Sequence, residues 1–291
     1  MAKHRASRRP TISIVGPGNL GTALAVTLSA AGYKVESIAM RRGSRGASRA
    51  RALTRRLGAR LFIVGSETIT GDIVWITVAD DAIADVARII AKSGDWKGKI
   101  VFHSSGALTS EELAPLRAKG ARVASVHPMM TFVRGKTPDM SDVAFAIEGD
   151  ASAARVANSI VAKIGGKGFA IRKKNKALYH VFGSFASPLL IALLAAMEDV
   201  ALAAGIEKKD IRSVALPLLR RTWGNYLVHG AGVAFTGPLM RGDAATVEKH
   251  LATLRKLKPH SHVYTALATS ALQNLPVKNR KQLSRTIARA R

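Results

Sequence analysis

The sequence contains no cysteine, and aromatic residues make up only 5% of its 291 positions. A chain without cysteine forms no disulfides, thiolate nucleophiles or cysteine-ligated metal sites, which is typical of a reducing compartment. We therefore expect the protein in the cytoplasm. The few aromatic residues form no segment of the kind that stacks on nucleic acid bases.

Acidic residues are also scarce, with 19 Asp and Glu against 45 Lys and Arg, for a formal net charge of +26. Such an excess attracts nucleic acid, anionic lipid or phosphorylated ligands. The basic residues are spread along the chain rather than gathered in one stripe, so we do not expect nucleic acid as a partner. A generally basic, solvated surface is the simpler interpretation.

Long uninterrupted apolar runs are missing as well. A basic start precedes the uncharged "TISIVGPGNLGTALAVTLSAAGY", as in a secretory signal, but Gly16, Pro17, Gly18 and Asn19 break the apolar run after five residues. A second uncharged run, 181–197, is shorter than the roughly 20 residues that a membrane helix needs, and it contains glycine, serine and proline. We interpret it as a buried helix and predict no membrane segment.

The first half of the chain alternates short apolar runs with helical segments. "TISIV", "DIVWITVAD" and "RVASVHP" are typical of buried strands, and "NLGTALAVTLSAAG" is typical of a helix. Repeated strand–helix–strand units predict a parallel sheet with helices on both faces. The predicted fold class is α/β: an N-terminal Rossmann doubly wound, mostly parallel sheet, followed by an all-α C-terminal domain.

Strand patterns stop near Lys173, and helical patterns follow. We predict a basic disordered tail over 1–10, a Rossmann domain over 11–172, a helical substrate and dimerisation domain over 173–276, and a basic, frayed or loosely helical tail over 277–291. Apolar helices such as "SPLLIALLAAMEDVALAAG" favour pairing between subunits. We therefore expect a homodimer formed through the helical domain.

The stretch "GPGNLG" fits the pattern G-x-G-x-x-G, here after a strand and at the start of a helix. In that context it predicts a dinucleotide-binding turn. Gly16 would allow the tight turn, Gly18 would let the backbone approach a pyrophosphate, and Gly21 would let the helix pack on the sheet. Asn19 and Leu20 open this helix, whose N-terminus attracts phosphate. A turn without a ligand is the alternative.

The residues after the second strand indicate which cofactor binds. Chains that bind NAD place an acidic residue there, but this sequence reads "AMRRGSR". Arg41 and Arg42 could bind a 2′-phosphate through their guanidinium groups. We therefore predict NADP(H), with a solvated arginine patch as the alternative.

Polar residues follow the fourth and fifth strands. Ala79 and Asp80 are expected along the cofactor ribose, although Asp80 or Asp81 could equally cap the next helix. Ser104 and Ser105 could hold the nicotinamide carboxamide or a substrate carboxylate, or form a turn before Gly106.

Several segments together resemble a known family, over roughly residues 11–275. They are "GPGNLGTAL", "VADDAI", "FHSSGAL", "ASVHPMMTF", "ALYHVFGSFAS" and "FTGPLMRGDAATVEKHLATL". The chain resembles bacterial two-domain proteins that join a Rossmann-like domain to a C-terminal domain of unknown function, labelled NADP oxidoreductase, deazaflavin-dependent-like. The resemblance implies a helical domain like that of 6-phosphogluconate dehydrogenase.

Related dehydrogenases place a catalytic lysine on the helix that corresponds to the one bearing Lys176, so the resemblance makes this residue a catalytic candidate. A solvated lysine at the end of the basic run "RKKNK" is the alternative. Many members of the family have Asn at the position of Pro188 in this chain. The proline should also kink the long helix in which it lies.

Hydride transfer needs a proton donor near the substrate heteroatom, and histidine titrates in the right range. His103 and His127 end strands, and His180 lies four residues after Lys176 on one helix face. We expect these groups to face a substrate cleft between the domains, with His127 as the first choice and histidines engaged in packing as the alternative.

Asn225 and Arg241 are candidates for substrate binding, although Arg241 could instead bond Asp243, the expected N-cap of the next helix. We find no metal-binding pattern. The sequence therefore predicts an NADP(H)-dependent oxidoreductase acting on a small, anionic carbonyl or imine compound. A non-catalytic NADP(H) or nucleotide sensor or scaffold is the alternative.

Overall fold

A computed structural model describes residues 9–44, 46–133 and 138–289. The expected N-terminal tail lies, except for its last two residues, outside the described residues. The chain forms two compact units, Met1–Phe185 and Ala186–Arg291. The expected domain boundary after residue 172 lies between the last strand and this change of unit, and it stays a prediction.

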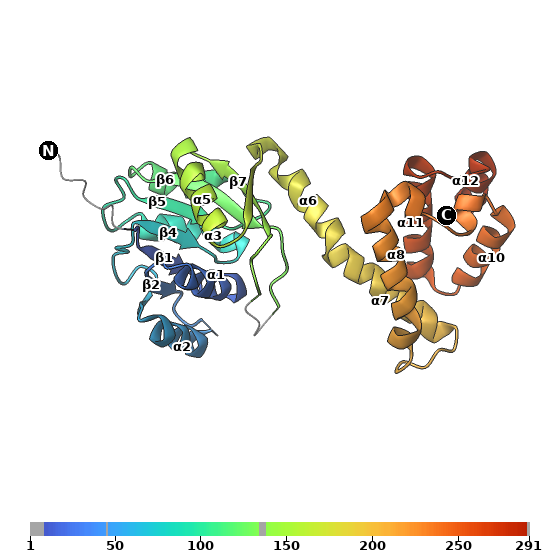
Figure 1. Ribbon diagram of the computed structural model, residues 1–291, viewed down its shortest axis with the longest axis horizontal. Coiled ribbons are helices and arrows are strands. Elements are labelled where there is room, and N and C mark those ends of the chain that lie inside the picture. The colour runs from blue at the N-terminus through green and yellow to red at the C-terminus, as the bar shows by residue number, and fades with distance from the viewer. Residues whose placement is uncertain (1–8, 45, 134–137, 290–291) are drawn as a thin grey trace. The chain divides into compact units, whose positions relative to one another are not determined.

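Eight strands form one sheet in the first unit (Figure 1). All except β8 are rich in apolar or β-branched residues. The strands are β1 (Ile12–Val15), β2 (Val35–Met40), β3 (Arg60–Ile63), β4 (Ile73–Ile76), β5 (Ile100–His103), β6 (Arg122–Pro128), β7 (Ala144–Gly149) and β8 (Lys167–Ala170).

The strand order is β3-β2-β1-β4-β5-β6-β7-β8, and every pair is parallel except β6 with β7. The predicted doubly wound, mostly parallel sheet is therefore confirmed. The order reverses direction between β1 and β4. In such sheets ligands bind outside the carboxyl ends of the strands at this reversal.

Helices cover both faces of the sheet (Figure 1). One apolar cluster joins the sheet to α1 (Asn19–Ala30), α2 (Ala47–Leu57) and α5 (Ala151–Lys163), and the other joins it to α3 (Asp80–Ile90), a 3-10 turn (Ser110–Leu113) and α4 (Ala114–Arg117). Gly58 ends α2 with a φ of 62°, a left-handed conformation that glycine adopts at little cost. A 3-10 turn (Lys173–Asn175) leads into α6 (Lys176–Ala186).

The second unit is helical throughout its regular structure, as predicted. Its helices are α7 (Pro188–Ala203), α8 (Ile211–Ala234), α9 (Pro238–Arg241), α10 (Ala244–Leu254), α11 (Lys258–Asn274) and α12 (Arg280–Ala288). Pro188 opens α7 and the break falls at Ser187, so the predicted interruption of the long helix is confirmed.

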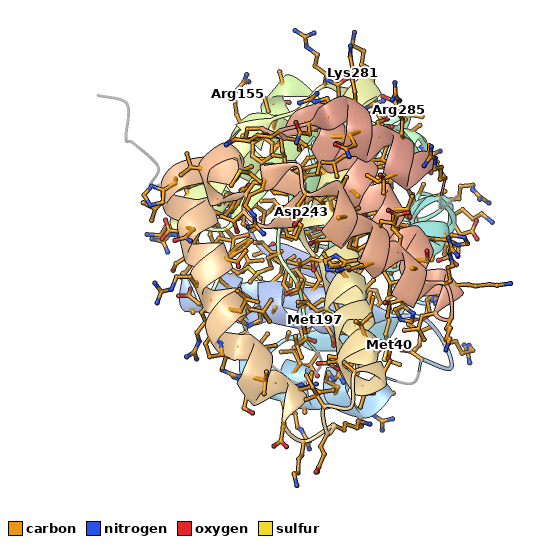
Figure 2. The ribbon with its side chains drawn as sticks, turned by 90° about the vertical axis from the view of Figure 1, so that its right-hand side faces the viewer. Met40, Arg155, Met197, Asp243, Lys281 and Arg285 are labelled. Carbon is orange, nitrogen blue, oxygen red and sulfur yellow. The ribbon has the colours of Figure 1, made fainter. Side chains whose placement is uncertain are left out.

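The basic C-terminal segment was expected to be frayed or loosely helical, and its described part contains the helix α12 rather than a frayed end. Leu283 and Ile287 are buried in a core cluster shared with α10 and α11, which holds α12 in place. Lys281 and Arg285 lie on the outer face of the same helix (Figure 2). Two apolar residues at helical spacing thus order a segment that composition alone marks as a tail.

The apolar run at 181–197 was expected to be buried, and this was wrong. Side chains such as Phe182, Phe185 and Ile191 are more than half exposed. Among the described residues, 173–203 is the one helical segment long and apolar enough to cross a membrane by length and composition, and an 18-residue window within it has a mean hydropathy of 1.8.

Candidate functional site

The glycine turn connects β1 to α1. Gly16 has a φ of +100°, which side-chain-bearing residues rarely adopt. A Cβ on Gly21 would lie 2.2 Å from the carbonyl oxygen of Gly16, so the helix packs against the turn itself. A Cβ on Gly18, by contrast, would meet nothing within 4 Å, which leaves the N-terminus of α1 open to a ligand.

Residues beyond the glycines hold this turn in shape. Thr77, just after β4, donates its hydroxyl hydrogen toward the carbonyl oxygen of Gly16 at 2.7 Å. Asn19 donates to the carbonyl of Phe132 at 3.2 Å and accepts from Arg49 at 3.1 Å. Leu20 packs against the apolar core. The side chains of Asn19 and Leu20 are thus committed to structure, and a ligand would meet backbone N–H groups here.

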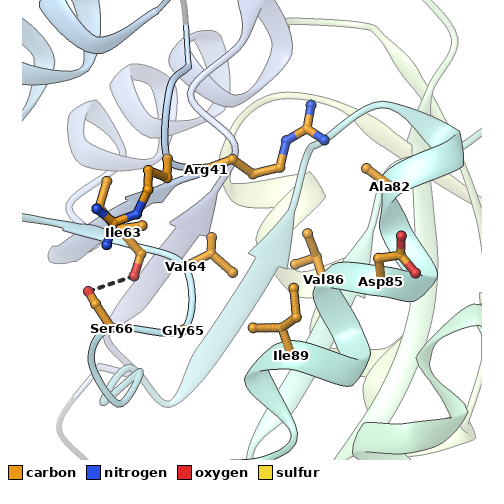
Figure 3. Close-up of a pocket in the computed structure, with 10 residues that line it drawn as sticks. Arg41, Ile63, Val64, Gly65, Ser66, Ala82, Asp85, Val86 and Ile89 are labelled. Carbon is orange, nitrogen blue, oxygen red and sulfur yellow. Dashed lines mark hydrogen bonds between the residues drawn. The ribbon is translucent and has the colours of Figure 1, made fainter.

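A cavity of about 390 Å³ lies beside the turn, and its charged lining residues are Arg41 and Arg49. A second cavity, of about 430 Å³, is lined by Arg41, Arg42 and apolar side chains, with Asp85 as its acidic residue (Figure 3). Arg41 therefore borders both cavities. The sequence prediction did not include Arg49 or Thr77, because neither belongs to the glycine pattern.

This arrangement fits a dinucleotide. The open side of Gly18 and the N-terminus of α1 suit a pyrophosphate, because the free N–H groups there carry partial positive charge. The apolar walls formed by Val64, Val86 and Ile89 suit an adenine ring. β2 ends at Met40 and is followed by Arg41 and Arg42, without a carboxylate that would repel a 2′-phosphate.

Asp80 and Ser105 connect the neighbouring strand ends. The N-cap of α3 is Ala79, so neither Asp80 nor Asp81 caps the helix. The carboxylate of Asp80 instead accepts a hydrogen bond from Ser105 Oγ at 2.7 Å. Ala79 and Asp80 are both exposed, and their expected place along a cofactor ribose stays a prediction.

The hydroxyls of Ser104 and Ser105 are engaged inside the protein. Ser104 Oγ accepts from the indole of Trp75 at 2.8 Å, and Ser105 Oγ also accepts from the N–H of Leu108 at 2.9 Å. Both serines are more than 90% buried. The geometry therefore favours the turn-forming alternative over direct contact with nicotinamide or substrate.

His103 is a structural residue. Its Nδ1 accepts from the N–H of Ser105 at 3.1 Å, so its Nε2 carries the hydrogen that bonds the carbonyl of Thr109 at 2.9 Å. Complete burial lowers the pKa of His103 to about 4. It is neutral at physiological pH and holds the loop that follows β5.

Lys176 is 1% exposed, which excludes the solvated alternative. Its Nζ donates to the carbonyl oxygen of Ser105 at 2.8 Å and to Ser125 Oγ at 2.6 Å. Burial lowers its pKa to about 8, against the opposing influence of Glu148 and Asp80. No carboxylate lies within ion-pair distance of it in the described part of the chain.

His127, Tyr179 and His180 meet next to Gly106. His127 Nδ1 lies 2.8 Å from the hydroxyl of Tyr179, and the two imidazole rings are 6.3 Å apart. A Cβ on Gly106 would come within 2.8 Å of His127 Nε2 and 2.7 Å of His180 Cδ2. Burial first, then the electrostatic influence of Lys176 and of His180, lower the pKa of His127 to about 4. Burial raises that of Tyr179 to about 12.

Tyr179 was not predicted from the sequence. It lies between two candidates, Lys176 and His180, and its spacing of three from Lys176 marks the same helix face. The first turn of α6 thus carries three polar groups to the carboxyl ends of β5 and β6. The exposed His180 and the partly buried His127 are the side chains of this group that a substrate can reach.

Asn225 and Arg241 belong to the second unit, on α8 and at the end of α9, and both are exposed. Asp243 is the N-cap of α10, as expected, and its carboxylate accepts from the N–H of Thr246 at 3.0 Å. The roles of Asn225 and Arg241 toward a substrate stay predictions. Within the described residues, no group of three or more His, Asp or Glu has a metal-binding arrangement.

Comparison with known proteins identifies the two domains of this chain. Residues 2–128 match a Rossmann-like domain and residues 143–271 match DUF2520, a domain of unknown function. No curated protein sequence matches the chain significantly. The protein is thus a two-domain protein in which a Rossmann-like domain precedes a DUF2520 domain, as the resemblance predicted.

Solved structures share this layout. A Bacteroides fragilis protein, BF3122, provisionally described as an NADP oxidoreductase, has a TM-score of 0.73 at 20% identity over 90% of this chain and 97% of its own. Protein TM1727 from Thermotoga maritima has a TM-score of 0.70 at 24% identity, over 96% and 99%. A reductive aminase from Aspergillus terreus, in complex with NADPH and ethyl-5-oxohexanoate, has a TM-score of 0.64 at 17% identity, over 95% and 99%.

Proposed function

We propose that the protein is an NADP(H)-dependent oxidoreductase that transfers a hydride to or from a small carbonyl or imine compound. The observation that carries the proposal is the open glycine turn at the start of α1, next to a cavity whose charged residues are arginines. The reductive aminase that shares the fold was solved with NADPH, which supports the same cofactor class here.

The choice of NADP(H) over NAD(H) rests on charge. Arg41 lines both cavities, Arg42 lines the second, and Arg49 lines the one at the glycine turn. Guanidinium groups bind phosphate through paired, charge-assisted hydrogen bonds. When bound, the cofactor would supply the hydride from its nicotinamide ring.

His127 is proposed to hydrogen-bond the substrate heteroatom. Its lowered pKa keeps it neutral at physiological pH, and a neutral imidazole can polarise a carbonyl through its N–H. Lys176 is too deeply buried to touch a substrate, so its proposed contribution is to hold the loop of Ser105. Its positive charge would favour an anionic substrate.

The cofactor proposal is tested by titrating the protein with NADPH and NADH and following tryptophan fluorescence. Tighter binding of NADH than of NADPH would contradict the proposal that the arginines bind a 2′-phosphate. Turnover is tested by following NADPH oxidation with a panel of keto acids and cyclic imines. Loss of turnover in His127→Ala with unchanged NADPH binding would support the proposed role of His127.

A non-catalytic sensor or scaffold for NADP(H) is the second candidate. The observation in its favour is that Ser104, Ser105 and Lys176 are all engaged in internal hydrogen bonds, which leaves few free polar groups. NADPH binding without turnover of any member of the panel would favour this candidate over the enzyme.

We also propose that a second copy of the chain covers the helical unit. Helix α8 exposes large apolar side chains, among them Leu218 at 70%, Leu227 at 65% and Val228 at 74%. Exposed apolar surface of this extent marks an interaction site, and most soluble oligomers are symmetric homodimers. The cytoplasm stays the expected compartment, and nucleic acid stays an unexpected partner.

The dimer is tested by analytical ultracentrifugation of the full chain and of Leu218→Lys combined with Leu227→Lys. We expect a dimer for the parent protein and a monomer for the variant, with equal helix content by circular dichroism. A monomeric parent protein, or one that partitions into lipid vesicles, would refute this part of the proposal.

A further inference from the structure

The hydrogen bond between Tyr179 and His127 joins a phenol to one specific ring nitrogen. Tyr179 is 8% exposed, its hydroxyl lies 2.8 Å from His127 Nδ1, and the two rings meet edge-on with centroids 5.6 Å apart. The position of the hydroxyl therefore identifies Nδ1 as the ring nitrogen in the hydrogen bond. Which of the two atoms carries the hydrogen has to be assigned from the surrounding hydrogen bonds.

Counting donors and acceptors assigns this hydrogen. A neutral imidazole has one nitrogen that donates and one that accepts, and a phenol has a single O–H. The hydroxyl of Tyr179 has no other hydrogen-bond partner among the described residues, and a buried O–H requires an acceptor. The O–H of Tyr179 thus donates to Nδ1, which leaves the hydrogen of His127 on Nε2.

His127 Nε2 lies close to Gly106, whose lack of a side chain leaves room for the imidazole ring. A Cβ at Gly106 would lie 2.8 Å from this nitrogen and 2.7 Å from His180 Cδ2. Any side chain at position 106 would therefore collide with both rings. The N–H on Nε2 is directed toward the loop after β5, beside the exposed imidazole of His180.

Burial and the neighbouring groups of α6 keep His127 neutral. Burial lowers its pKa most, Lys176 and His180 of α6 lower it further, and the result is about 4. Tyr179 is uncharged, because burial raises its pKa to about 12. A neutral ring carries only one N–H, so the identity of the protonated nitrogen decides what His127 can do.

We propose that Tyr179 is a positioning residue that fixes His127 in the tautomer with its hydrogen on Nε2. The use of this N–H toward a substrate heteroatom rests on the proposed function, whereas the tautomer itself does not. No covalent step involves Tyr179, which keeps its own hydrogen throughout.

Nitrogen NMR of the full-length protein tests the assignment. The eight histidines are labelled with 15N, and the signals of His127 are identified by their loss in His127→Gln. Long-range 15N–1H correlation spectra distinguish a protonated Nε2 from a protonated Nδ1. We expect His127 to show a protonated Nε2 and an unprotonated Nδ1 from about pH 6 to 8, two pH units or more above its pKa.

Tyr179→Phe should change this pattern without unfolding the protein. Loss of a typical hydrogen bond should shift the tautomer ratio of His127 about five-fold toward Nδ1–H. The chain offers a matched control, since His250 Nδ1 and the hydroxyl of Tyr264 form a second such pair at 3.1 Å in the other unit. Tyr264→Phe should leave the signals of His127 unchanged.

The outcomes separate this inference from the proposed function. Protonated Nδ1 in the parent protein, or an unchanged His127 spectrum in Tyr179→Phe, would overturn the inference whatever the activity. The expected spectra with no turnover of any substrate would support the tautomer and refute the enzyme. If the protein is an enzyme, Tyr179→Phe should lower kcat in proportion to the fraction of His127 that leaves the Nε2–H tautomer, by at most about five-fold, and leave the KM for NADPH unchanged.

Discussion

The side-chain amine of Lys176 lies 2.8 Å from the carbonyl oxygen of Ser105, 71 residues earlier in the chain. The same Ser105 donates its hydroxyl hydrogen to Asp80 at the start of α3. One buried residue therefore links α6, the loop after β5 and the helix that follows β4. This link makes the charge of Lys176 important for the stability of the whole site.

The pKa of Lys176 predicts how stability depends on pH. It is about 8 in the folded protein, below the ordinary 10.5, so between these values the unfolded chain binds more protons than the folded one. The free energy of unfolding should therefore rise with pH across this window, by roughly 3 kcal/mol in total from this residue. Urea unfolding of the parent protein and of Lys176→Met at several pH values would measure the difference.

Lys174→Met is the control for this experiment, because Lys174 is an exposed lysine two residues away. It should show the same pH dependence as the parent protein. If the free energies of unfolding of the parent protein and of Lys176→Met changed in parallel between pH 8 and 10.5, the folded-state pKa of Lys176 would not be lowered.

Two glycines of the turn should respond differently to alanine. Gly18→Ala places its methyl group in open space, so we expect a change of at most about 1 kcal/mol in the free energy of unfolding and a clear loss of NADPH affinity. Gly21→Ala forces a methyl group to 2.2 Å from a backbone oxygen, which should cost roughly 2–3 kcal/mol of stability. Denaturation and NADPH-binding measurements on both variants test these two expectations. Unchanged NADPH affinity in Gly18→Ala would argue against a pyrophosphate at the turn.

The arginines after β2 should discriminate between cofactors. Replacing Arg41 and Arg42 together by serine should raise the Kd for NADPH about ten- to hundred-fold and leave that for NADH nearly unchanged. Replacing Arg55 and Arg56, exposed on α2 and outside both cavities, should change neither value. If the variant at Arg41 and Arg42 bound NADPH and NADH more weakly by the same factor, these arginines would not recognise a 2′-phosphate.

Gly106→Ala should disturb the two imidazoles without affecting the cofactor turn. The added methyl group would have to displace His127 or His180, and a shift of about 1 Å in a reacting group can lower turnover about 100-fold. We expect this loss in kcat together with an unchanged Kd for NADPH. Full activity in the alanine variant would show that neither ring needs its observed position.

Much of the fold was predictable because its signals are local. Apolar runs of strand length, helical periodicity and the glycine turn lie within short segments, and each has one favourable conformation. Pro188 likewise predicted an interruption in the long helix, because its ring removes a hydrogen-bond donor wherever it stands.

What the sequence misjudged, left open or did not reveal concerns what lies next to each segment. The run at 181–197 is apolar, but its side chains are exposed, since burial depends on neighbouring elements rather than on composition. Ser104 and Ser105 were candidates for ligand contacts, yet Trp75 and Asp80 occupy their hydroxyls. The sequence did not predict a role for Tyr179, because its hydrogen-bond partner, His127, is 52 residues away in the chain.

The sequence by itself determined the alternation of strands and helices, the glycine turn and the arginines that follow β2, because these depend on residues close together in the chain. Only the tertiary structure decided that Lys176 is buried, that both serines are engaged internally and that Tyr179 bonds His127. Those outcomes depend on which strand ends meet the first turn of α6, and that meeting is set by the packing of the whole sheet.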